Sequence, residues 1–338
     1  MAHAAQVCYW DGSTDTDFAT DANWTGTAAE VPEADDEVIF DSRQCTKPTT
    51  GMADSESGAS ARCTFDLVHF KEGYTGGIGT AALPFCCAPD KIIIEGTGTY
   101  YILCGKDDQT TDADIDVVII NNPSAIVYLY SNANVAAGNL CEFTKVYLVA
   151  GTLHVAFYDP DTVDQGCYVK DLYLVPRHND PSNALCYIEK DAYDCVSSVA
   201  TNIYMGNGTL VTDSMVGTFV MQGGTVYYGS EKYIGTAVTE ADMDIALLRM
   251  SAGTFYWLPD DTGTPTITLA YIFGGTFTCD DAISPDIAKT ITTISAFTGA
   301  TLDFRNNKGN ITVTNLYNHG AVIETDKGVK VGITYNQP

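Results

Sequence analysis

The sequence predicts an all-β protein whose main part is a parallel β-solenoid, also called a β-helix. The first observation is a phrase that recurs with drift, in which apolar and polar residues alternate, run into Gly-Thr and alternate again. The second is its spacing, because the glycine of the phrase, or the alanine in its place, recurs 20 to 29 residues apart, at Gly224, Gly253, Gly275, Ala300 and Gly320. A repeat of this length cannot bury its own apolar face, so it has to stack on its neighbours.

The third observation is that the apolar runs are short and alternate with a period of two, as β-strands require, while no long segment has a helical period. A β-sandwich with regular turns is the alternative fold. It stays open at this point because Gly-Thr followed by an apolar residue also occurs in hairpins.

The chain divides into two predicted parts. Residues 1–90 are rich in acidic and small residues, with brief strand candidates at 38–40 and 64–70, and we expect an N-terminal cap or attachment module there. Residues 91–338 are expected to form the solenoid. Its strand candidates lie at residues 92–94, 100–103, 116–121 and 125–130, followed by the clearest copies of the phrase at 146–155, 203–212, 219–228, 248–257 and 271–279. Loops are expected between them at 159–165, 177–183, 231–244 and 280–289.

Each part of the phrase has a predicted role in a coil. The glycine supplies the bend or positive φ of a coil corner, and the threonine stacks its hydroxyl in a ladder along the coils. The apolar residue after the threonine points inward, because strand side chains alternate between the two faces. We therefore expect a core column made of Leu153, Leu210, Val226, Phe255 and Phe277.

Composition and charge narrow the function. The chain has 338 residues, is 45% hydrophobic and is 18% charged, which indicates a folded protein. Its 17 Lys and Arg against 43 Asp and Glu give a formal net charge of −26, so nucleic acids and anionic membrane surfaces would repel it. The first ten residues lack the pattern of a signal peptide, and no apolar stretch is long enough to span a membrane.

The eleven cysteines contain no CxxC pair, which argues against a zinc module or a redox motif. We expect most of them to be small buried residues in a protein made in a reducing cytoplasm. Cys45 with Cys63 and Cys186 with Cys195 could close loops if the protein matures outside the cell.

The sequence carries no predicted catalytic or cofactor site. Its aspartate pairs stand among turn residues, and none of the five arginines lies beside them, although a polysaccharide-cleaving site would need a basic residue next to its acids; the pairs are Asp107-Asp108, Asp260-Asp261 and Asp280-Asp281. Two triplets are spaced suggestively for oxygen ligation but do not follow the EF-hand pattern, so Ca²⁺ is the one cofactor left open; they are Asp11, Asp15, Asp17 and Asp112, Asp114, Asp116. The five histidines are isolated, without zinc spacing.

The N-terminal segment carries a phrase of its own. Trp10-Asp11-Gly12 is followed by Asp17-Phe18, Asn23-Trp24, Val31-Pro32 and the run Asp35 to Asp41. This order resembles the opening phrase of many long β-helical proteins, found in autotransporter-like bacterial surface proteins and in virion proteins of tailed bacteriophages. In physical terms, Trp10, Phe18, Trp24 and Phe40 would close the open end of the first coil, as cap or attachment residues.

The resemblance implies a function class. Without an export signal or a recognisable catalytic domain, we expect a non-enzymatic structural protein of a phage virion, a capsid decoration protein that binds the major capsid protein or another virion protein. It would be a homotrimer, since solenoids present long flat faces and closed symmetry is the norm. It would be assembled in the host cytoplasm and exposed on the particle exterior. The alternatives are a receptor- or glycan-binding fibre, spike or surface adhesin and, ranked below these, a polysaccharide depolymerase.

Overall fold

The protein is described here from a computed structural model. The structure describes residues 5–27, 30–44, 64–81, 84–104, 114–131, 133–134, 139–140, 142–155, 167–176, 184–188, 199–212, 216–229, 244–258, 265–279, 288–305, 311–325 and 334–335. The chain forms two compact units, Met1–Lys170 and Asp171–Pro338. Both are β-solenoids, and the only helix in the part described is a 3-10 turn, η1 (Asp21–Asn23).

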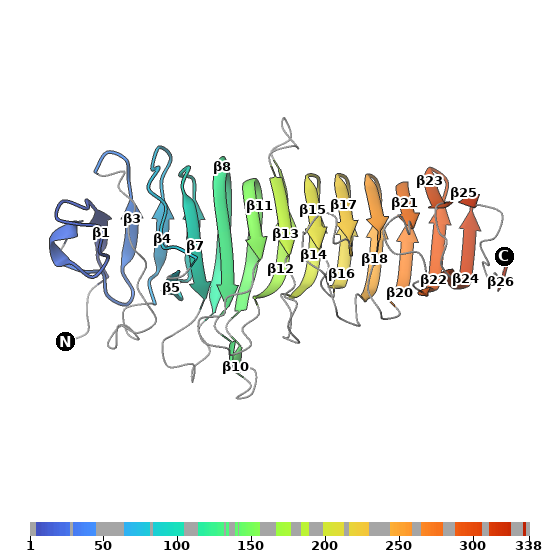
Figure 1. Ribbon diagram of the computed structural model, residues 1–338, viewed down its shortest axis with the longest axis horizontal. Helices are drawn as coiled ribbons and strands as arrows, with labels where there is room; N and C mark the ends of the chain where they lie inside the picture. Colours follow the sequence, from blue (N-terminus) through green and yellow to red (C-terminus); the bar gives the residue numbers. More distant parts are fainter. Residues whose placement is uncertain are drawn as a thin grey trace. The chain divides into compact units, whose positions relative to one another are not determined.

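One face of the first unit is a stack of parallel strands in the order β1, β3, β4, β6, β8 and β11 (Figure 1). Their bounds are β1 Val7–Trp10, β3 Glu37–Phe40, β4 Leu67–Phe70, β6 Lys91–Ile94, β8 Ile115–Ser131 and β11 Glu142–Val155. Every second side chain points inward, so one core column runs through Phe40, Phe70, Ile94, Ile120 and Leu148.

A second face begins with β5 (Phe85–Cys87) and β7 (Thr99–Cys104), which pair in parallel. The candidates at 116–121 and 125–130 are one long strand, β8, which turns a corner: its first half pairs with β6 and its second half with β7. β11 follows the same path, with register shifts between Leu148 and Thr152 and a positive φ of 119° at Gly151. A short separate sheet pairs β9 (Ala133–Asn134) with β10 (Asn139–Leu140).

Parallel stacking starts earlier in the chain than the sequence predicted. β1, β3 and β4 already belong to the stack, and β4 pairs with β6 across the expected boundary at residue 90. The compact units divide at Lys170 instead. The N-terminal segment is therefore itself made of coils, because its brief strands share the register of the strands that follow.

Each coil of the second unit has two strands joined by a tight turn. The first strands stack in parallel in the order β14, β16, β18, β20, β22, β24 and β26, with bounds Val199–Met205, Val216–Met221, Ile245–Met250, Thr266–Ile272, Lys289–Phe297, Ile311–His319 and Thr334–Tyr335. The second strands do likewise from β13 through β15, β17, β19, β21 and β23 to β25, with bounds Ala184–Ile188, Thr209–Thr212, Thr225–Tyr228, Thr254–Trp257, Gly275–Cys279, Ala300–Phe304 and Val322–Thr325. β12 (Tyr168–Leu174) spans the boundary between the units.

The repeated phrase has the predicted structure. Its glycines adopt positive φ at the corners, for example 85° at Gly224 and 90° at Gly253. The threonines that follow lie in register as Thr209, Thr225, Thr254, Thr276 and Thr301. Because these strands pair in parallel and not in hairpins, the β-sandwich alternative is wrong.

The predicted core column is buried. Leu210, Val226, Phe255 and Phe277 are direct register partners in consecutive coils of the second unit, and each is 0% exposed. Leu153 is equally buried but belongs to the first unit, where its register partner is Val127. The predicted loops at 159–165, 177–183 and 231–243 lie outside the described residues, as does 280–287. Lys289, expected in a loop, is instead the buried first residue of β22.

Candidate functional site

The four aromatic side chains of the N-terminal phrase meet in one cluster in the interior. Trp24 makes edge-on contacts with Trp10 at 5.2 Å and with Phe18 at 4.8 Å between ring centroids, and it lies 6.0 Å from Phe40. Phe40 then stacks on Phe70 of the next coil at 4.5 Å. All four predicted residues are at most 1% exposed. They pack the end of the core, so a partner that binds this segment would contact other side chains.

Strand pairing explains how this end is closed. β2 (Trp24–Gly26) runs antiparallel to β1 and covers the edge of β1 that faces away from β3. An uncovered edge strand would offer unpaired backbone groups to other chains. The antiparallel return therefore ends the parallel stack at this side.

The polar residues of the phrase hold the cap in place. The Asn23 side chain accepts hydrogen bonds from the backbone N–H groups of Thr14 and Asp15, and it donates to the Asp17 carbonyl at 2.8 Å. The Trp24 indole N–H donates to the Phe18 carbonyl, also at 2.8 Å. Asn23 and Trp24, which belong to the phrase that resembles β-helical openings, thus make hydrogen bonds within the N-terminal cap itself.

Asp36 has a comparable role at the next strand. This buried carboxylate accepts the backbone N–H groups of Gln6 at 2.9 Å and Glu33 at 2.8 Å. The Cys8 thiol points at it from 3.8 Å, and burial, reinforced by the Asp36 charge, raises the pKa of Cys8 to about 12. The Cys8 side chain packs in the interior, and the Asp36 carboxylate accepts hydrogen bonds from backbone N–H groups.

The carboxylates proposed for calcium make turns. Asp11, Asp15 and Asp17 each accept the backbone N–H two residues further on, at 2.8 to 2.9 Å. No group of three potential metal ligands occurs among the described residues. Asp112 and the pairs 107–108, 260–261 and 280–281 lie outside the described residues.

The described cysteines are all buried: Cys8, Cys86, Cys87, Cys104, Cys167, Cys186 and Cys279. Burial raises the pKa of Cys167 to about 12. Cys45, Cys63 and Cys195, the remaining members of the two candidate loop-closing pairs, lie outside the described residues. In the part of the chain that is described, no helix is long and apolar enough to cross a membrane.

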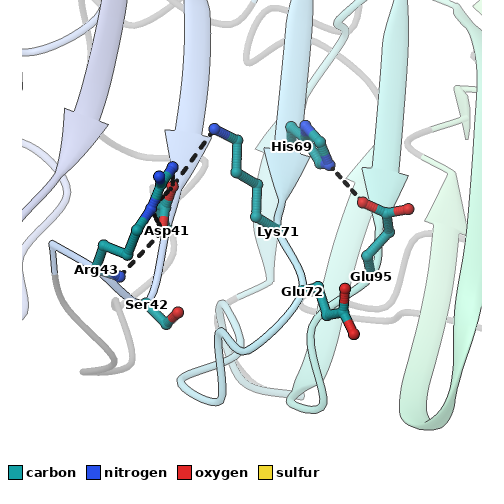
Figure 2. A pocket seen from close by; sticks show the side chains of 7 residues that line it. All are labelled: Asp41, Ser42, Arg43, His69, Lys71, Glu72 and Glu95. Atoms are coloured by element: carbon teal, nitrogen blue, oxygen red, sulfur yellow. Dashed lines mark hydrogen bonds and ion pairs between the residues drawn. The ribbon is translucent and has the colours of Figure 1, made fainter.

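A depression of about 280 Å³ lies at one corner of the first unit (Figure 2). It is lined by Asp41, Ser42, Arg43, His69, Lys71, Glu72 and Glu95. Asp41, Lys71 and Glu95 each follow the last residue of a stacked strand, β3, β4 and β6. Parallel stacking therefore brings three charges from three coils to the same corner.

Ion pairs fix one side of this corner depression. The Arg43 guanidinium holds the Asp41 carboxylate through Nε at 3.0 Å and through a terminal nitrogen, and Lys71 Nζ reaches the same carboxylate at 3.4 Å. The hydrogen bonds from Arg43 hold the pKa of Asp41 well below its usual range, although its burial acts in the opposite direction. Asp41 is therefore ionised and positions two cations, which leaves this side with one net positive charge.

The other side of the corner depression carries acceptors. His69 Nε2 lies 3.0 Å from Glu95 Oε2, and Glu72 stands below them at the bottom of the view in Figure 2. The Glu95 side chain is 37% exposed and that of His69 is 19% exposed. The side chains of the depression are thus all polar or charged, with Arg43, Lys71 and the Asp41 carboxylate on one side and Glu72 and Glu95 on the other.

Outward aromatic residues form stacked rows along the coils. In the first unit, Tyr101, Tyr128 and His154 are register partners, with centroids 4.8 and 4.4 Å apart and planes within 12° of parallel. Tyr227 stacks on Tyr256 in the second unit at 5.1 Å. Because the ring faces contact one another, these rows present ring edges outward and offer no broad ring face to a sugar.

The most exposed row lies beside the turns of the second unit; we name it the corner row, and it consists of Phe273, Phe297 and His319. Centroids are 4.8 Å apart between Phe273 and Phe297 and 4.7 Å between Phe297 and His319. Phe273 is 48% exposed. Tyr271 lies 6.3 Å from Phe273 and carries the Arg249 guanidinium at 5.9 Å from its ring centroid.

Comparison of the chain with models of known protein families, with curated proteins and with solved structures gives no match. Function therefore has to be argued from the residues themselves.

Sequence reasoning missed both the corner depression and the corner row. A signal for the depression was present, since the strand endings VIFD, VHFK and IIIE place a charged residue at the same position of three repeats. For the corner row, Phe273 and Phe297 stand just before the glycines of two consecutive turns. Neither pattern shows which coils are neighbours until the register is known.

Proposed function

We propose that the chain is a non-enzymatic structural protein of a bacteriophage virion, which decorates the capsid by binding the major capsid protein. The opening phrase supports the phage context, because it resembles the start of β-helical virion proteins. A stack of coils also suits a spacer or brace, since it repeats the same surface along its length.

The corner row is the observation that carries a binding role. Phe273 is a large apolar side chain with 48% of its surface exposed, and it is continued by Phe297 and His319. Aromatic residues and arginine are enriched in the centres of protein interfaces, and Arg249 stands beside this row. Because the four N-terminal aromatic side chains are buried in the core, the corner row is the better contact surface for the capsid protein.

Charge defines what that capsid surface would look like. A chain with a formal charge of −26 needs a basic patch or bridging cations on whatever it decorates. Such charges steer the encounter and are screened by salt, whereas aromatic contacts persist. Assembly as a homotrimer about the particle's symmetry axes is part of the same proposal.

The direct test is mass spectrometry and quantitative gel analysis of purified particles from the source of this sequence. We expect the chain at a fixed copy number, in a multiple of three per site. Absence of the chain from these purified particles would overturn the proposal.

A variant tests the surface. Phe273→Ser should lower particle occupancy, with at least about tenfold weaker binding to capsids, because truncating an aromatic hot-spot residue costs about 2 kcal/mol or more. Ile126→Ser is the matched control, since Ile126 is also an exposed apolar residue, at 39%, but belongs to the other unit. Equal occupancy of both variants would remove the corner row from the binding surface.

A further inference from the structure

The corner depression is lined by polar and charged side chains, and Asp41 positions two cations in it. We propose that it binds the carboxylate of an acidic sugar, a hexuronate unit, independently of any contact with a capsid. Figure 2 shows the side chains that would contact this ligand.

The first step concerns the cations. Arg43 uses Nε and one terminal nitrogen on Asp41, which leaves its second terminal nitrogen as a donor, and its side chain is 79% exposed. Lys71 Nζ makes a single 3.4 Å contact with Asp41 and has three protons to donate. Since one carboxylate is shared by two cations, the group still carries one positive charge, which a second carboxylate would neutralise through charge-assisted hydrogen bonds.

The second step concerns the acceptors. Glu72 and Glu95 line the same depression, and Glu95 has one oxygen engaged with His69 and one further oxygen available as an acceptor. These carboxylates disfavour phosphate or sulfate, which offer them few or no hydrogen-bond donors. A ligand that pairs one carboxylate with several hydroxyl donors satisfies both sides of the depression, and a hexuronate has this combination.

The volume of the depression and the short range of charge interactions both limit the ligand. A volume of about 280 Å³ is at the small end for ligand sites and suits one sugar unit, not an extended chain. The chain's net charge does not decide the matter locally, because at physiological ionic strength charges beyond about 8 Å are largely screened. A single unit of this size should bind with a dissociation constant on the order of 1 mM.

The test is saturation-transfer NMR titration of the full chain with methyl glucuronoside. The neutral methyl glucoside is the control ligand, because it has the same ring and differs in lacking the carboxylate. We expect saturable binding of the glucuronoside and at least about fivefold weaker binding of the glucoside, because the neutral sugar loses the charge-assisted hydrogen bonds, whose contribution is reduced but not abolished by exposure to solvent. No saturation by the glucuronoside, or equal affinities for both sugars, would overturn the proposal.

Variants assign the site. Lys71→Gln should weaken glucuronoside binding about fivefold with an unchanged melting curve, because Asp41 keeps Arg43 as its partner. Arg43→Gln is the second variant, for use if Lys71→Gln fails to fold. Lys145→Gln removes an exposed lysine from β11 and should bind like the wild type. Unchanged binding by both depression variants, or tighter binding of glutamate than of the glucuronoside, would show that the site does not recognise a uronate.

Discussion

Replacing Trp24 by alanine tests how the N-terminal end of the stack is closed. The side chain is 1% exposed, contacts three other aromatic rings and donates its indole N–H to the Phe18 carbonyl. Truncating a buried tryptophan costs about 3–5 kcal/mol, which includes the cavity left among those rings. The lost hydrogen bond leaves the Phe18 carbonyl without this donor, which contributes about 1 kcal/mol of that cost.

The effect should be local, because a solenoid coil contacts mainly its neighbours. We therefore expect amide hydrogen exchange in β1, β2 and β3 to become at least about 100-fold faster, since 3 kcal/mol corresponds to roughly that factor. Amides of β16 and β18 in the second unit should keep their wild-type exchange. Hydrogen-exchange mass spectrometry at peptide resolution measures both.

Trp24→Phe is the matched control. It keeps an aromatic ring in the cluster and removes the indole N–H, so exchange in β1 and β2 should accelerate clearly less than in Trp24→Ala. Wild-type exchange in β1 and β2 of Trp24→Ala would falsify the role of this residue as the closing element. Equal acceleration in both units would refute the local character of the cap.

Two further predictions concern a turn and an ion pair. Gly253→Ala should destabilise the second unit by at least about 1 kcal/mol, because φ is 90° and the added Cβ would lie 2.5 Å from the Gly224 carbonyl oxygen; Gly206→Ala, whose nearest atom is at 3.5 Å, should be tolerated far better in thermal melts. Asp41→Asn removes a carboxylate whose pKa is lowered in the folded state mainly by the side-chain hydrogen bonds from Arg43. A lowered folded-state pKa stabilises the fold above the unfolded value of about 4, and this contribution is lost as the pH falls through the folded value. The melting temperature of the wild type should therefore exceed that of the variant at pH 6, and this difference in melting temperature should shrink towards pH 2. A difference that does not depend on pH would contradict the role given to the Asp41 charge.

Much of the fold was predictable because it depends on short-range patterns of apolar, polar and glycine residues that recur along the chain. Alternation fixed which residues face inward, and the Gly-Thr phrase marked the turns where Gly224 and Gly253 adopt positive φ. Repetition at 20 to 29 residues predicted stacking, and the parallel register of Val226, Phe255 and Phe277 agrees with it. The boundary predicted at residue 90 differs from the division at Lys170. The composition of the sequence changes near residue 90, but strand pairing continues across that position, from β4 to β6.

The candidate site was less predictable, because it depends on which coils are neighbours. The sequence by itself determined the strands, the turns and the inward-facing residues, which depend on residues close together in the chain, and the acidic net charge, which depends on composition alone. Only the tertiary structure decided that Asp41, Lys71 and Glu95 share one corner, or that the rings of Phe273 and Phe297 stack on each other. The physical reason is that a local pattern sets the direction of a side chain, whereas its neighbours are set by the register between strands distant in sequence.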